Sequence, residues 1–266
     1  MKFTILVTLI LSTLALITSF KKSLNNRKKH KSHKSKNVHK SHNKVIILGV
    51  DKKNKEVIVD FHNELRNSIA TTGAYNGVNL GFFATDMKQI NWDVNLENKA
   101  QEHANKCVIS YSPQRDRRGV QFTQGESLFT LVTKGGDYVP DWKVAMNHWF
   151  SQIKNFSKRK IASFYLKGKN SYDFSQAIWS KTDKIGCGFN NGCVVPQGKM
   201  SIFVCHYAPI GNNVNYPVYH AENKVPLSTS TPCPGGLPRS SKYPGLCCEQ
   251  DICIQAEEKK EEPDDE

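Results

Sequence analysis

Long apolar runs are scarce in this chain. One covers residues 3–17, and no other segment approaches the 18 apolar residues that a membrane-spanning helix needs. This run follows Lys2 and ends at the small residues Thr18 and Ser19, which is typical of a secretory signal peptide. We therefore expect a signal peptide at residues 1–19, a secreted, extracellular product and no stable membrane insertion after cleavage. A retained signal anchor is the alternative.

The short motifs of several enzyme classes are absent. The sequence contains no His-Glu-x-x-His, no Gly-x-Ser-x-Gly and no glycine-rich phosphate loop. Ser127 and Ser175 lie beside the acidic residues Glu126 and Asp173, but a serine nucleophile also needs a histidine base within reach. We expect no catalytic residues and favour a binding protein over an enzyme.

Acidic residues are missing from residues 21–44, which contain ten Lys or Arg and four His among Ser and Asn. Such a composition cannot bury enough apolar surface to fold, so we expect a disordered basic arm at residues 20–49. The arm is either a solubilising or propeptide segment, or a site for anionic polymers such as sulfated glycans. Residues 255–266 are predicted to be a disordered acidic tail.

Zinc-type cysteine spacing is also missing, because no two of the eight cysteines are separated by two residues. In an exported chain this favours disulfides. Four cysteines lie in the body and four in a Pro- and Gly-rich segment placed at residues 221–254: Cys107, Cys187, Cys193 and Cys205, then Cys233, Cys247, Cys248 and Cys253. The pairing of the C-terminal four stays open.

Aromatic and branched residues predict a β-hairpin. One strand is placed at residues 174–180 and the other at residues 201–207, beyond a Pro-Gln-Gly turn at residues 196–198. Because the midpoint lies near residue 196, Cys187 and Cys205 should face each other at a distance that a disulfide spans. This pairing leaves Cys107 for Cys193.

Apolar spacing predicts three amphipathic helices. Their stripes are Val57, Phe61, Leu65 and Ile69; Leu96, Ala100, Ala104 and Cys107; and Trp142, Ala145, Met146, Trp149 and Ile153. Together with strands at residues 125–133, 174–180 and 201–207, they predict an α+β fold at residues 50–220. Helices on both faces of a central antiparallel sheet give a three-layer α-β-α sandwich, followed by a short disulfide-rich C-terminal appendage.

Several segments, in this order along the chain, resemble the motifs of the CAP superfamily, the cysteine-rich secretory, antigen-type and pathogenesis-related proteins. They are Val-Asp-Phe-His-Asn-Glu-Leu-Arg at 59–66, Ala-Asn-Lys-Cys at 104–107, Gly-Glu-Ser-Leu at 125–128, Asp-Phe-Ser-Gln-Ala-Ile-Trp at 173–179, Ile-Gly-Cys-Gly-Phe at 185–189 and Phe-Val-Cys-His-Tyr-Ala-Pro-Ile-Gly-Asn at 203–212. The resemblance covers residues 50–220. It implies the same sandwich, the same two body disulfides, and venom-allergen-like roles in extracellular signalling or immune modulation, or in carriage of sterols or other lipids.

The resemblance also implies a central cleft, which such proteins typically line with two His and two Glu able to hold a divalent ion. Carried over by position, this set becomes Tyr111, Glu126, Gln152 and Asp173, in which only Glu126 matches. We therefore expect a degenerate tetrad with no metal and no other cofactor. Glu126 and Asp173 are expected in one cleft, where they repel each other, hold a hard cation weakly, or are hydrogen-bonded through the other two residues.

The remaining features are assigned ordinary roles. Of the histidines in the body, His62 and His103 are expected on the surface or in hydrogen bonds, and His206 in packing or in the strand ladder, while His148 is assigned no role. Asn155 begins a glycosylation sequon. The receptor or other extracellular partner cannot be named from the sequence. The alternatives to a secreted binding protein are a metal-dependent hydrolase that uses the cleft and a matrix protein anchored to glycans by its basic arm.

Overall fold

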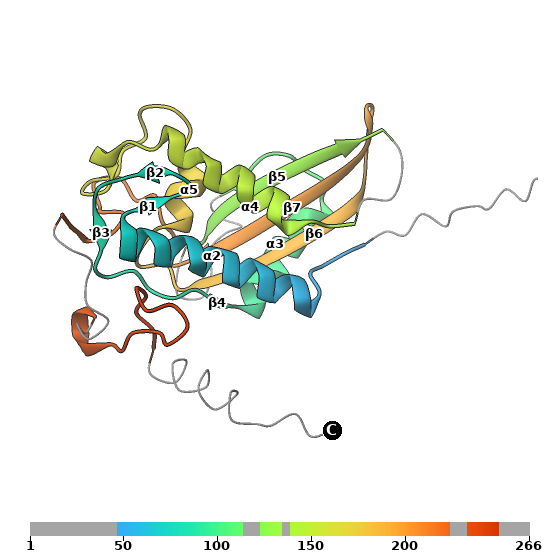
Figure 1. The fold of residues 1–266 in the computed structure, drawn as a ribbon. Coiled ribbons are helices and arrows are strands. Elements are labelled where there is room, and N and C mark those ends of the chain that lie inside the picture. The colour runs from blue at the N-terminus through green and yellow to red at the C-terminus, as the bar shows by residue number, and fades with distance from the viewer. Residues whose placement is uncertain (1–46, 114–122, 135–138, 224–232, 250–266) are drawn as a thin grey trace, which may run out of the picture. The chain divides into compact units, whose positions relative to one another are not determined.

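The structure is a computed structural model that describes residues 47–113, 123–134, 139–223 and 233–249 (Figure 1). The predicted signal peptide, nearly all of the basic arm, the acidic tail and Cys253 lie outside these residues. In the described part of the chain, no helix is both long enough and apolar enough to cross a membrane.

Four α-helices and eight strands make up the described fold (Figure 1). The helices are α2 (Lys52–Thr72), α3 (Val94–Asn105), α4 (Trp142–Phe150) and α5 (Tyr172–Ala177), with 3-10 turns η1 (Ser151–Asn155), η2 (Lys158–Lys160) and η3 (Pro234–Gly236). The strands are β1 (Ala74–Tyr75), β2 (Val78–Asn79), β3 (Phe83–Ala84), β4 (Asn91–Trp92), β5 (Gly125–Thr133), β6 (Lys184–Val195), β7 (Gly198–Ala208) and β8 (Ala221–Glu222).

The main sheet has the strand order β4-β6-β7-β5. Neighbouring strands of this sheet are antiparallel, except that the short β4 runs parallel to β6. The sequence does not predict this parallel pair. Side chains alternate between the two faces of a strand. On β7, Ile202 and Val204 therefore pack with Ala100 and Ala104 of α3 in one small core.

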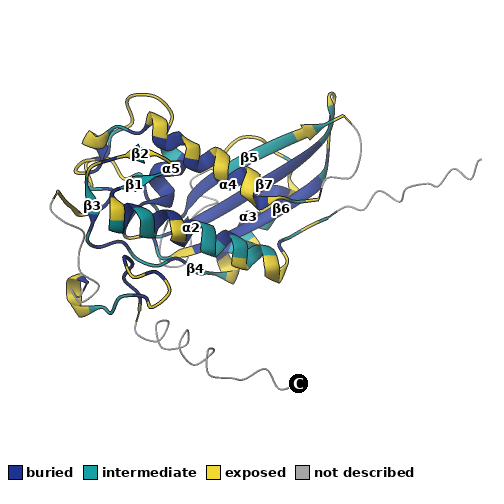
Figure 2. Cartoon of the chain, viewed as in Figure 1, coloured by how far each residue is buried: buried dark blue, intermediate teal, exposed yellow. Residues whose placement is uncertain are grey.

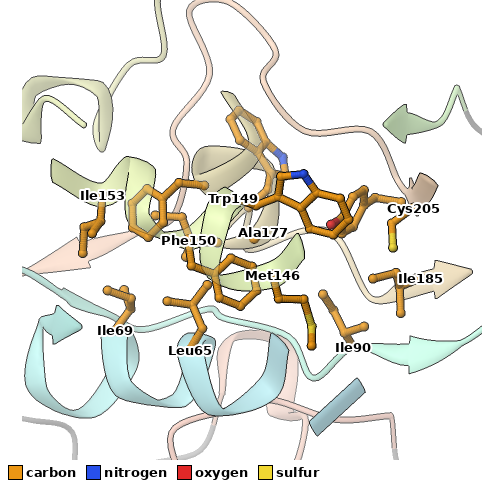
Figure 3. Packing of buried hydrophobic residues seen from close by; sticks show 14 of the residues in the cluster. Leu65, Ile69, Ile90, Met146, Trp149, Phe150, Ile153, Ala177, Ile185 and Cys205 are labelled. Atoms are coloured by element: carbon orange, nitrogen blue, oxygen red, sulfur yellow. The ribbon is translucent and has the colours of Figure 1, made fainter. Parts of the chain in front are cut away.

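The opposite face of the sheet packs against α2, α4 and α5 in the larger core. Figure 3 shows Leu65 of α2 beside Met146 and Phe150 of α4, with Cys205 at the sheet. These side chains are buried, and in Figure 2 the main strands are likewise largely buried between the helices. Each buried large apolar side chain contributes about 1.5–3 kcal/mol to folding. The result is the α-β-α sandwich that the sequence predicts.

Aspartate caps start the three long helices in the way their sequences suggest. Asp51 accepts a hydrogen bond from the Asn54 backbone N–H at the start of α2, and Asp93 accepts one from the Leu96 backbone N–H at the start of α3. Asp141 caps α4. Such caps satisfy backbone N–H groups that have no partner within the helix. The three predicted helices are confirmed.

Two glycines of β6 let α3 lie unusually close to the sheet. A Cβ added to Gly188 would stand 2.4 Å from the Gln101 nitrogen of α3, and one added to Gly186 would stand 2.1 Å from the Glu97 nitrogen. Both distances are far inside van der Waals contact. The Ile-Gly-Cys-Gly-Phe segment therefore has glycine on the face that α3 covers, whereas Cys187 points to the other face.

The strand predicted at residues 174–180 is wrong, because this segment forms helix α5 and the turn after it. Phe174, Ala177 and Ile178 are spaced at i, i+3 and i+4, so the same apolar residues also suit a helix, and short apolar runs do not separate the two. The first strand of the hairpin is instead β6. The turn near residue 196 holds, and Cys187 pairs with Cys205 in the β6–β7 register.

The structure contains the two body disulfides expected from the sequence, Cys187–Cys205 and Cys107–Cys193. In the appendage Cys233 is bonded to Cys247, and Cys248 is also disulfide-bonded. Residues 233–249 pack onto the body. Tyr243 and Leu246 belong to the larger core, and the Cys247 N–H donates to the Met87 carbonyl over 2.8 Å.

Arg66 of α2 is fully buried and holds the segment that follows α5. Its guanidinium group donates to five backbone carbonyls at 2.8–3.3 Å, those of Lys88, Ala177, Trp179, Ser180 and Thr182. Burial lowers the pKa of Arg66 to about 9, so it is still charged at neutral pH. This contact fixes where α5 ends, and so fixes one wall of the site described next.

Candidate functional site

Asp173 and Gln152 form a buried, reciprocal pair between α5 and η1. The Gln152 Nε2 donates to Asp173 Oδ2 over 2.6 Å, and the Asp173 backbone N–H donates to Gln152 Oε1 over 3.1 Å. Only 4% of Asp173 and 8% of Gln152 are exposed. The sequence analysis offers hydrogen bonding of Glu126 and Asp173 through Tyr111 and Gln152 as one alternative; of that arrangement, the structure contains the Gln152–Asp173 part.

Ser127 and Tyr111 lie near Asp173. Burial raises the pKa of Asp173, and the hydrogen bond from Gln152, with the nearby hydroxyls of Ser127 and Tyr111, works against that rise. Tyr111 itself is 52% exposed. Three of the four predicted positions, Tyr111, Gln152 and Asp173, thus come together.

Glu126 lies on the other side of the sheet. Successive residues of β5 point to opposite faces, so Glu126 faces α3 while Ser127 faces the larger core and Asp173. The expectation that Glu126 and Asp173 share one cleft is therefore wrong. Position-by-position comparison assigns both Glu126 and Asp173 to the family's cleft. Because side chains alternate between the two faces of β5, however, Glu126 points to the face opposite Asp173.

Glu126 instead contacts two histidines. Glu126 Oε2 lies 3.2 Å from His103 Nδ1 of α3 and 2.9 Å from His206 Nε2 of β7. The other carboxylate oxygen accepts the Ser112 backbone N–H at 2.8 Å. The side chains of His103, Glu126 and His206 are 4%, 0% and 2% exposed. Three elements, α3, β5 and β7, therefore bring two imidazoles and one carboxylate into a closed space.

Hydrogen bonding governs the charge of this cluster. Burial by itself raises the pKa of Glu126, but hydrogen bonds from His103, His206 and the Ser112 N–H hold that pKa well below its usual range. Burial lowers the pKa of His103, and its interaction with Glu126 outweighs this effect and raises it. Glu126 is therefore ionised, with positive charge favoured beside it.

Sequence reasoning misses this cluster, although it predicts a hydrogen-bonded role for His103. One signal was available. Ala100 and Ala104 mark the face of α3 that is buried, and His103 lies on the same side; Ile202, Val204 and His206 share one face of β7 by their even spacing. What the sequence does not supply is the pairing of β5 with β7, which places Glu126 opposite His206.

Comparison with known proteins identifies the family. The profile of the cysteine-rich secretory protein family, CAP, matches residues 59–207. This chain belongs to the CAP family. The match falls within the domain predicted at residues 50–220 and includes both the cleft pair and the His103–Glu126–His206 cluster.

Curated CAP relatives include venom proteins. The chain is 31% identical over 210 residues to "CRISP/Allergen/PR-1" of Trittame loki, covering 77% of this chain and 50% of that protein. It is 31% identical over 202 residues to "Scoloptoxin SSD43" of Scolopendra dehaani, covering 75% and 86%. This chain therefore spans about half the length of the first relative and most of the second.

Solved CAP structures support the fold. The structure of BmVAL-1 matches with a TM-score of 0.58 and 26% identity, covering 76% of this chain and 96% of that one. The match covers about three quarters of this chain and supports the α+β sandwich that the sequence predicts.

The CAP cleft of this chain does not suit the family's divalent ion. Tyr111 is half exposed, and Gln152 Nε2 already donates a hydrogen bond to Asp173 Oδ2. Glu126 lies on the face of β5 opposite Asp173. No imidazole stands at the four carried-over positions. Zinc favours nitrogen and thiolate ligands, so these four residues do not match its usual donor set.

A serine also approaches the histidine cluster, which bears on the hydrolase alternative. Ser112 Oγ lies 2.8 Å from His103 Nδ1, the same nitrogen that meets Glu126. The opposite nitrogen, Nε2, faces the Val108 carbonyl at 3.2 Å. In a Ser-His-acid triad the acid and the serine use opposite ring nitrogens. This arrangement therefore lacks the geometry of that triad.

Proposed function

We propose that this CAP protein is secreted and acts outside the cell by binding an anionic polymer such as a sulfated glycan, rather than by catalysis. The observation that carries the proposal is a basic lobe, defined as residues 142–172. It contains seven Lys or Arg and no Asp or Glu. The venom-protein and allergen names of the relatives support secretion.

The basic side chains of the lobe are mostly exposed. Of the seven, only Lys160 is buried. The other six lie at the surface: Lys143, Lys154, Lys158, Arg159, Lys167 and Lys169. The Asn155 Nδ2 donates to the Asn170 carbonyl over 3.0 Å, so the middle of the lobe lies beside its C-terminal part. Clustered charge of one sign raises the local concentration of oppositely charged polymers. Glycosylation of Asn155, which is exposed here, stays a prediction.

The cleft supports binding without catalysis. Asp173 is held by Gln152 in two hydrogen bonds, and neither cleft serine, Ser127 or Ser175, has a histidine among its hydrogen-bond partners in the described residues. Extracellular signalling, immune modulation, and carriage of sterols or other lipids remain predictions. The basic arm at residues 20–49 would add to the same charge, and it is proposed as a second contact for the polymer.

Heparin affinity chromatography of the full chain tests the proposal. The lobe variant replaces four exposed lysines with glutamine: Lys154, Lys158, Lys167 and Lys169. The matched control removes the same charge elsewhere by replacing Lys52, Lys53, Lys106 and Lys184 with glutamine. We expect the lobe variant to elute at clearly lower salt than the control, since the lobe charges act together and salt screens them.

A third protein replaces the ten basic residues at 21–44 with glutamine to measure the contribution of the arm. Equal elution of the lobe variant and its matched control would refute the lobe as a binding surface. Failure of the unmodified chain to bind heparin at physiological salt would refute the proposed function itself.

A further inference from the structure

The buried cluster of His103, Glu126 and His206 has the composition of a metal site. The ligand atoms of the three side chains all lie within 4.8 Å of one another. Two imidazoles and one carboxylate are a donor set that zinc uses in proteins, whereas calcium and magnesium prefer oxygen ligands alone. The cluster lies on the α3 side of the sheet, and the CAP cleft with Asp173 lies on the other.

The outer nitrogen of each histidine faces an oxygen. His103 Nε2 lies 3.2 Å from the Val108 carbonyl, and His206 Nδ1 lies 3.2 Å from Gln124 Oε1. A histidine that binds a metal usually donates its other N–H to an oxygen, which fixes the tautomer and aims the ring. With the proton on the outer nitrogen, the inner nitrogen directs a lone pair at Glu126.

In those tautomers two lone pairs would converge on Glu126 Oε2, at 3.2 Å from His103 Nδ1 and 2.9 Å from His206 Nε2. Nitrogen lone pairs and an anionic oxygen repel each other unless positive charge lies between them. Protons on the inner nitrogens supply that charge, and so does a single divalent cation. Release of those protons to solvent would accompany binding of the ion.

We propose that His103 Nδ1, His206 Nε2 and the Glu126 carboxylate bind one divalent transition-metal ion, with zinc the best match. The side chains are at most 4% exposed, so the site is closed, as structural zinc sites are. Ser112 Oγ lies 2.8 Å from His103 Nδ1 and so offers a further oxygen beside the three ligands. The ion joins α3 to β5 and β7. The proposal departs from the absence of metal expected from the degenerate tetrad.

The experiment must separate this site from the arm, which contains four histidines of its own: His30, His33, His39 and His42. The parent protein is therefore the full chain with these four replaced by glutamine, stripped of metal with a chelator. Zinc chloride is titrated by calorimetry, and the melting temperature is measured with and without zinc. We expect one zinc per chain, micromolar affinity or tighter, and a higher melting temperature with zinc.

Three ligand variants, His103→Gln, Glu126→Gln and His206→Gln, should each weaken zinc binding at least about tenfold. Gln124→Ala, which removes an orienting partner, should weaken it about 10–100-fold without removing a ligand. The matched controls are His148→Gln, a histidine outside the cluster, and Asp173→Asn, the carboxylate of the cleft. Both controls should bind zinc as the parent does.

Absence of zinc binding by the parent, or equal binding by the ligand variants and controls, would overturn the proposal. A ligand variant that does not fold is replaced by a spectroscopic measurement on the folded parent. Cobalt should give the intense visible bands of a four-coordinate site. The weak spectrum of six-coordinate, largely hydrated cobalt would also overturn the proposal.

Discussion

His62 should make the stability of this protein depend on pH. It lies on α2 and is fully buried, with Nδ1 2.8 Å from the Ile58 carbonyl and Nε2 3.0 Å from the Tyr207 hydroxyl. A carbonyl only accepts, so Nδ1 carries the proton and Nε2 accepts from Tyr207. Burial, together with the nearby positive charge of Arg66, lowers the pKa of His62 to about 4, although the hydrogen bond to the Ile58 carbonyl works against this shift.

The magnitude follows from the difference between the folded and unfolded states. The ordinary pKa is 6.5, so between pH 6.5 and about 4 the unfolded chain binds a proton that the folded chain excludes. The contribution of neutral His62 is therefore fully present above pH 6.5 and is lost as pH falls toward 4. At pH 5 the loss relative to pH 7.5 is about 2 kcal/mol, at about 1.4 kcal/mol per pKa unit.

Urea denaturation of the parent and His62→Phe at pH 7.5 and pH 5.0 measures this loss. Phenylalanine fills a similar volume beside Phe150 but does not titrate. The variant should be less stable at pH 7.5, since it loses two hydrogen bonds, yet its unfolding free energy should fall by about 2 kcal/mol less on going to pH 5. Other titrating groups are common to both proteins and cancel. Equal pH dependence of the two proteins would refute the assignment of a neutral, buried His62.

Three further changes have directions that the structure sets. Arg66→Lys replaces five donors with three and should lower the unfolding free energy by at least about 3 kcal/mol; a urea midpoint near that of the parent would count against it. Gly188→Ala inserts a Cβ 2.4 Å from the Gln101 nitrogen and should cost about 1–3 kcal/mol, measured as a lower melting temperature, and an unchanged value would show that α3 can move away. Replacing Cys187 and Cys205 together by alanine should cost about 2–4 kcal/mol in the same assay, and no loss would mean that the bridge adds little.

The sequence predicts most of the fold because its local signals agree with the tertiary structure. Asp51, Asp93 and Asp141 cap helices whose apolar stripes are the buried ones. The strand predicted at residues 125–133 has the observed bounds of β5. The segment that became α5 is only six residues long, and Arg66 from another helix fixes its end, so no local pattern could decide its structure.

The site was harder to predict because it depends on strand parity and on pairing between distant strands. Motif positions correctly bring Gln152 to Asp173. They place Glu126 on the wrong face, since a motif gives the position of a residue in the chain and not the direction of its side chain. His103 and His206 are 103 residues apart, and they meet at Glu126 only because α3 packs on the sheet and β5 pairs with β7.

The buried guanidinium of Arg66 has a consequence for how this domain opens. Its five carbonyl partners come from residue 88 and from residues 177–182, so releasing any one segment leaves a charged group in the interior with unmade hydrogen bonds. Partial opening there therefore carries the cost of those unmade hydrogen bonds. Amide hydrogens in α2 and in the segment after α5 should exchange with solvent in a single cooperative event, so this part of the domain behaves as one foldon.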